Sequence, residues 1–119
     1  MIPKLNRFHG YGSLRSVYRS GQTVRGPLFA VKVIDSPSRK AYRLAVVVSR
    51  KVDKSAVRRN KIRRRLYQAA QQMDPPIKNS CDIVVTVFQA EAATKPYELI
   101  TSQLAKQLAA AAALQAKTQ

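Results

Sequence analysis

Alternation of apolar and polar residues predicts extended structure in the first half of this 119-residue chain and again near residue 85. A strand over residues 28–34 places Phe29, Val31 and Val33 on one face and Lys32 on the other. The strand over 42–49 is almost wholly apolar, as in the centre of a sheet. The predicted strands, the first of them weak, are 22–25, 28–34, 42–49 and 82–88.

Helical spacing of apolar residues predicts three helices, at about 13–21, 55–73 and 96–114. In the first, Ser13 is suited to the N-cap, Leu14, Val17 and Tyr18 share one face, and Gly21 is a stop signal. The second helix should end before two prolines, and the third should begin with Pro96 in its first turn. The expected core-facing residues of these two helices are Ile62, Leu66, Ala69 and Met73, then Ile100, Leu104 and Leu108.

This order of elements, α-β-β-β-α-β-α, predicts an α+β fold, an α/β sandwich with a central sheet of about four strands and packed helices. The length and a hydrophobic content of 45% are those of one domain over residues 1–119. Residues 1–12 are expected to be irregular and residues 115–119 to form a frayed tail.

Charge is distributed unevenly along this fold. Residues 1–65 contain 18 of the 22 basic residues and two of the six acidic ones, while residues 66–119 sum to zero. The whole net charge of +16 therefore belongs to the first half. Because such a charge opposes folding by self-repulsion, it indicates a polyanionic partner bound to that half.

The charge is densest at residues 50–65, with nine basic residues and one acidic residue. On the second helix, the face opposite the apolar one groups Asn60, Lys61, Arg63, Arg64 and Tyr67. Like charges four residues apart repel, and acidic partners at that spacing are missing, so this face favours an external anion such as RNA phosphate. A membrane-surface helix would need bulkier apolar anchors, and a DNA-recognition helix would need a preceding helix where a strand is predicted.

The sequence offers little for catalysis by the protein itself. Cys81 is the only cysteine, which excludes an internal disulfide and is best explained as a small semi-buried residue. His9 is the only group that titrates near neutral pH, and the six carboxylates are scattered. No apolar run is long enough to span a bilayer, and residues 1–7 lack the apolar core of a signal peptide. We therefore expect no catalytic residues, no metal site, no membrane and a cytoplasmic location.

Five motifs resemble the bacterial ribonuclease P protein family. Arg59-Asn60-Lys61-Ile62-Arg63-Arg64, after the strand and loop Val46-Val47-Val48-Ser49-Arg50-Lys51-Val52, is similar to the family's Arg-Asn-Arg-x-Lys-Arg helix. The chain has Lys61 where Arg is usual and Arg63 where Lys is usual. The other similar segments are Leu14–Gly21, with Leu14 replacing an aromatic residue, Phe29, Asp82-Ile83-Val84-Val85 and Tyr97-Glu98-Leu99.

The resemblance implies a left-handed βαβ crossover and a role as the protein subunit of ribonuclease P. In that endoribonuclease the RNA subunit, with Mg²⁺, removes the 5′ leader from precursor tRNA. The protein is implied to be one monomer bound to one RNA, gripping it through the Arg-Asn helix and holding the single-stranded leader between the first helix and the sheet.

Helix face and resemblance together predict two sets of site residues. The RNA-binding set is Arg50, Lys51, Arg58, Arg59, Asn60, Lys61, Arg63, Arg64 and Tyr67. The leader-cleft set is Leu14, Tyr18, Phe29 and Val31. The alternative function is a structural ribosomal RNA-binding protein, which shares the basic helix and lacks the leader cleft.

Overall fold

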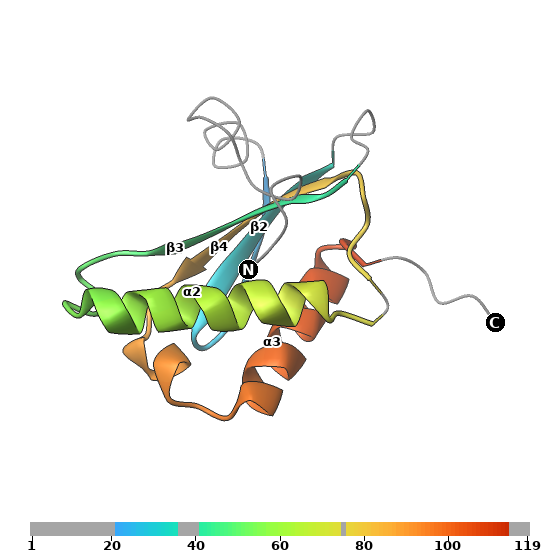
Figure 1. The fold of residues 1–119 in the computed structure, drawn as a ribbon. Helices are drawn as coiled ribbons and strands as arrows, with labels where there is room; N and C mark the ends of the chain where they lie inside the picture. Colours follow the sequence, from blue (N-terminus) through green and yellow to red (C-terminus); the bar gives the residue numbers. More distant parts are fainter. Residues whose placement is uncertain (1–20, 36–40, 75, 115–119) are drawn as a thin grey trace.

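In the computed structural model, the described residues are 21–35, 41–74 and 76–114. They form a four-stranded mixed sheet with two α-helices packed on one face (Figure 1), which confirms the predicted α+β class. The predicted helix at 13–21 lies outside the described residues apart from its last residue. The elements, in chain order, are β1 (Gln22–Arg25), β2 (Phe29–Asp35), β3 (Arg43–Val48), α2 (Ala56–Gln71), β4 (Cys81–Val87), the 3-10 helix η2 (Ala90–Ala93) and α3 (Tyr97–Ala110).

The strand order is β1-β2-β4-β3, so β4 is a central strand and β3 lies at an edge. β2 pairs antiparallel with β1 and β4, whereas β3 pairs parallel with β4. Parallel pairing requires a crossover, and α2 supplies it. The prediction that residues 42–49 form a central strand is therefore wrong. The run is apolar because α2 packs against β3, and the hydroxyl of Tyr67 accepts a hydrogen bond from the edge N–H of Val46 at 3.3 Å.

The hydrophobic core fills the space between one sheet face and the two helices. Residues of the predicted faces of α2 and α3 are all buried there, as expected from their spacing. Fully burying an aliphatic or aromatic side chain contributes about 1.5–3 kcal/mol, so this layer provides most of the stabilisation. The largest fully buried side chains of this layer are Phe29, Val31, Ile62, Leu66, Ile77, Ile83, Ile100, Leu104 and Leu108.

The opposite face of the sheet is more polar. Register places Arg43 of β3 beside Asp82 of β4, and the guanidinium donates to both carboxylate oxygens at 3.0 and 2.7 Å. Both residues are buried, and so is Val84, which lies two residues after Asp82 on β4. Ala30 and Lys32 of β2 lie on this same face because they alternate with core residues.

The ends of the helices follow local capping chemistry. Ser55 caps α2, its Oγ accepting from the N–H of Arg58 at 3.3 Å. α3 ends at Ala110, short of the predicted Leu114. The chain turns there because Ala112 adopts φ 57°, and the N–H of Ala113 donates to Leu108 O at 2.8 Å. The predicted extension of the helix to residue 114 is wrong.

The implied left-handed crossover and the single domain over 1–119 stay predictions. None of the helices among the described residues combines the length and apolar character that a membrane span requires.

Candidate nucleic-acid interface

The interface is built on the loop between β3 and α2 and on the outer face of α2. Two backbone hydrogen bonds, from Val52 and Asp53 to Ser49 O, close the loop at 3.1 and 3.4 Å. Asp53 Oδ1 accepts from the N–H of Ser55 at 2.9 Å, and Arg59 Nη1 donates to the carbonyls of Asp53 and Lys54 at 2.9 and 3.1 Å. The basic residues of this loop are thus presented from a fixed backbone at the N-terminus of α2.

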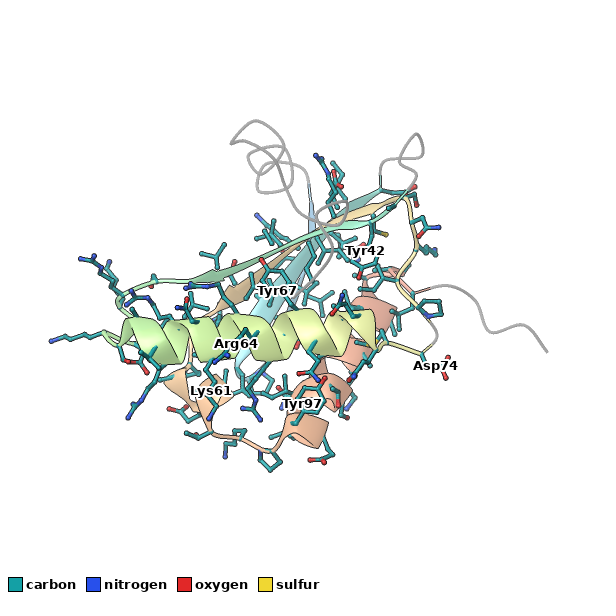
Figure 2. The ribbon with its side chains drawn as sticks, in the orientation of Figure 1. Tyr42, Lys61, Arg64, Tyr67, Asp74 and Tyr97 are labelled. Carbon is teal, nitrogen blue, oxygen red and sulfur yellow. The ribbon has the colours of Figure 1, made fainter. Side chains whose placement is uncertain are left out.

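Cations are concentrated at this end of the molecule, where side chains ending in nitrogen fan out from the N-terminal end of α2 (Figure 2). The first turn of α2 contains no acidic residue. In the described part of this loop and helix, Asp53 is the only acidic residue, and it lies 3.6 Å from Arg58. The positive helix N-terminus adds to the same field, so the surface suits a polyanion. The exposed basic residues of this loop and helix are Arg50, Lys51, Lys54, Arg58, Lys61 and Arg64.

A cavity of about 420 Å³ follows the outer face of α2. The described residues that line it are Val57, Asn60, Arg63, Arg64 and Tyr67. Arg63 donates to Asn60 Oδ1, so the side-chain N–H groups of Asn60 can still donate to an acceptor such as a phosphate or ribose oxygen. Val57, an apolar residue that is 75% exposed, adds a non-polar contact among these charges.

Tyr67 is half-buried and reaches from α2 toward the sheet (Figure 2), and it lines the same cavity as the exposed Arg64, one turn earlier. Its hydroxyl is engaged with Val46, so Tyr67 offers the interface its ring and not its hydroxyl. The structure thus brings together Asn60, Arg63, Arg64 and Tyr67 around one cavity. The remaining residues of the predicted RNA-binding set lie on the loop and the first turns of α2.

Two arginines of the basic segment have structural partners that the sequence pattern does not reveal. Arg59 is held by the loop carbonyls described above. Arg65 donates to Ala92 O at 2.8 Å and to Lys95 O, which fastens the segment after β4 to α2. Both bonds of Arg65 span about 30 residues of sequence, so helical periodicity alone gives no signal for them.

The predicted leader cleft is only partly tested by the described residues. Leu14 and Tyr18 lie outside them. Phe29 and Val31 are 0% exposed and point into the core between the sheet and the helices, so their prediction as leader contacts is wrong. Their neighbours Ala30 and Lys32 are partly exposed and lie on the sheet face opposite α2 and α3. The two-residue period of a strand is the signal that would have separated the two pairs.

The remaining titratable groups of the described residues are dispersed. No three His, Cys, Asp or Glu side chains within 21–35, 41–74 and 76–114 gather to hold a metal ion. Burial is the main cause that raises the pKa of the Cys81 thiol, with the charge of Asp35 adding to it. Cys81 is therefore an inert, buried thiol, in keeping with the structural role expected from the sequence.

Comparison with known proteins gives a consistent result. The family model described as ribonuclease P matches residues 2–112. The ribonuclease P protein component of a Pseudanabaena species is 34% identical over 115 residues, covering 96% of this chain and 97% of that protein. That of a Picosynechococcus species is 31% identical over 86 residues, covering 72% of this chain and 73% of the relative.

Solved structures agree with this result. A mutant of the Staphylococcus aureus RNase P protein superposes with a TM-score of 0.81 at 25% identity, covering 93% of this chain and 92% of that one. The RNase P protein of Thermotoga maritima has the same fold, with a TM-score of 0.74 at 22% identity over 86% of this chain and 94% of that one.

Proposed function

This chain belongs to the ribonuclease P protein family, and we propose that it holds the single-stranded 5′ leader of precursor tRNA while the RNA subunit cleaves it. It is an RNA-binding subunit of that endoribonuclease and associates with ribonuclease P RNA. A structural ribosomal role is not favoured, because the relatives and the structural neighbours are ribonuclease P proteins.

The observation that supports RNA binding most directly is the unneutralised outer face of α2. Arg58, Lys61 and Arg64 are exposed there, with Asp53 as the one acidic residue of the described loop and helix. Guanidinium groups bind phosphate oxygens bidentately, and Asn60 adds amide donors for phosphate or sugar. We propose that this face and the loop at 49–55 grip the RNA subunit.

The leader is proposed to lie along the uncovered face of the sheet. Register aligns Arg25, Ala30 and Thr86 in one row across this face. In the next row Thr23 and Lys32 are accessible, whereas their neighbour Val84 is fully buried. Small side chains bordered by cations suit a single strand, whose phosphates need positive charge and whose bases need a surface to pack on. Tyr18, by the family resemblance, would supply a ring for stacking.

In this division of labour the RNA subunit performs the hydrolysis and binds most of the Mg²⁺. The described residues do not offer a metal site: Asp82 is paired with Arg43 and Asp53 with the start of α2. The protein contributes charge neutralisation and positioning. We further propose a cytoplasmic location and a complex of one protein with one RNA.

Reconstitution tests the subunit role. The protein should stimulate 5′ cleavage of precursor tRNA by a ribonuclease P RNA at low Mg²⁺, where RNA–RNA repulsion is screened least. A ribosomal protein of equal charge is the control for unspecific screening. Equal stimulation by that control would remove the basis for a specific subunit role.

A second assay separates leader binding from binding of the RNA subunit. Lys32→Ala and Tyr18→Ala should weaken binding of the holoenzyme to precursor tRNA, by about 1–3 kcal/mol where a stacked base is lost, and leave mature tRNA unaffected. Lys78→Ala, which removes a charge at the start of β4, is the matched control. Equal weakening of both tRNAs by well-folded variants would rule out a leader contact.

A further inference from the structure

A second cavity lies between β1, the turn that follows it and α3, at the edge of the sheet opposite β3. Its volume is about 220 Å³, below the roughly 300–1,000 Å³ of pockets for drug-sized ligands. α3 contributes residues at positions i, i+3, i+4 and i+7, which share one helix face. The lining residues of the described chain are Val24, Arg25, Gly26, Pro27, Gln103, Lys106, Gln107 and Ala110.

The floor of this cavity is a buried glutamine that is only half satisfied. Gln107 is 6% exposed, and its Nε2 donates to Val24 O at 3.0 Å and to Phe29 O at 2.9 Å. These two bonds fix the amide orientation, because only the nitrogen can donate to carbonyls. Its Oε1 is buried and has no hydrogen-bond partner among the described residues. Gln103 Oε1, on the preceding turn of α3, is likewise buried, with no partner in the described part of the chain.

Gly26 permits this arrangement. A β-carbon at position 26 would lie 2.6 Å from Gln107 Oε1 and 2.8 Å from its Cδ, closer than such contacts occur. The turn after β1 therefore approaches the amide as closely as a backbone without a side chain allows. Two buried acceptors left unpaired beside this cavity are costly, which favours a donor from outside. Because both oxygens are sealed from solvent, the glutamine side chains must turn to let a donor reach them.

The chemistry of the lining defines that donor. Two amide oxygens require N–H or O–H groups, and an amino group can donate to one or both of them. Val24, Pro27 and Ala110 provide apolar contact for a flat body, and the volume suits one small ring system. Exposed Lys106 lines the same cavity and adds a cation there, whereas the guanidinium of Arg25 stacks on Phe88, 4.6 Å from the ring centroid, on the opposite face of the sheet.

We propose that this cavity binds one unpaired nucleotide of RNA through a base with an exocyclic amino group, such as adenine. The amino group donates to the oxygens of Gln107 and Gln103, and the phosphate meets Lys106. Unpaired bases are read in this way by RNA-binding proteins, on their edges and by packing on their faces. The proposal rests on the proposed RNA-binding function and adds a second contact, remote from α2.

The test is an NMR titration of the isolated chain that follows the side-chain amide signals of Gln103 and Gln107. Adenosine should shift both signals saturably. Purine riboside, which lacks only the amino group, should bind about 2- to 13-fold more weakly, the value of one hydrogen bond. Equal affinity for the two nucleosides, or no shift at either glutamine, would overturn the proposal.

Variants give a second line of evidence. Gln103→Met keeps the length of the side chain and removes one acceptor, so adenosine should bind at least about twofold more weakly, whereas Gln89→Met, on the surface, should change nothing. AMP should bind more tightly than adenosine, and Lys106→Ala should remove that gain where Lys78→Ala does not. If Gln103→Met lowers the melting temperature, the comparison of the two nucleosides in the unmodified chain decides alone.

Reconstituted enzyme separates this proposal from the function on which it rests. Loss of stimulated cleavage with the unmodified chain would defeat the proposed function. Stimulated cleavage together with indifference of Gln103 and Gln107 to adenosine would defeat only the nucleotide site.

Discussion

Replacement of Arg64 by Ala should weaken assembly with the RNA subunit and flatten the salt dependence of that assembly. Arg64 is exposed on the outer face of α2 and lines the cavity beside Asn60. Each phosphate contact adds about 0.7–0.9 to the slope of log affinity against log salt. If one contact is lost, the ratio of the RNA affinity of the unmodified chain to that of the variant should therefore fall by about 2.6- to 3.5-fold between 50 and 200 mM salt. Adding Arg63→Ala should double the change in slope.

The assay is filter binding or fluorescence anisotropy with labelled ribonuclease P RNA over that salt range. Arg65→Ala is the sharpest control, because Arg65 is the next residue and carries the same charge but bonds to Ala92 O and Lys95 O. It should lower the free energy of unfolding, by about 1–3 kcal/mol for hydrogen bonds of a charged group, with little effect on the slope. If Arg64→Ala and Arg65→Ala changed the slope alike, charge alone and not the α2 face would explain binding.

Three further predictions concern stability. At matched ionic strength, sulfate should raise the melting temperature more than chloride does, because a clustered anion site binds it in the folded state; equal melting curves would count against such a site. Ala112→Gly should raise the free energy of unfolding by about 0.5–1 kcal/mol in urea denaturation, since Ala112 has φ 57°, and a loss of stability would contradict this. Asp82→Ala should cost about 3–5 kcal/mol by leaving Arg43 buried without its carboxylate, and a cost below 1 kcal/mol would show that the pair is solvated.

Local pattern was enough to predict the strands and the apolar faces of α2 and α3, because each depends on neighbours within one or two turns. The order of strands in the sheet depends on contacts far apart in sequence. Residues 43–48 and 81–87 are both apolar runs, yet only the second is paired on both sides. α2 and the Tyr67 hydroxyl cover β3 well enough to support an apolar sequence at an edge. Composition therefore could not tell the edge strand from the central one.

The basic segment shows the same limit for the site. Its sequence predicts a charged face, and the exposed positions of Lys61 and Arg64 agree with that prediction. Identical residues in the same segment have other partners: Arg59 binds loop carbonyls and Arg65 binds the chain after β4. Since those partners lie either in an irregular loop or about 30 residues away, only the folded chain separates arginines that hold the protein together from arginines left for RNA.

On β2, a shift of one residue along the strand moves a predicted leader contact from the core face to the opposite face of the sheet. The predicted leader contacts on β2 are Phe29, which aligns with an aromatic residue of the family, and Val31, which shares its strand face. The two faces of β2 lie in different environments. Its apolar face packs in the core, where Phe29 and Val31 are both 0% exposed. Any ligand on the other face must meet Ala30 and Lys32. The register partners of Ala30 are Arg25 and Thr86, and those of Lys32 are Thr23 and Val84. With a lysine on that strand in place of a ring, the contribution of β2 to leader binding should be electrostatic, and its loss should be felt most at low salt.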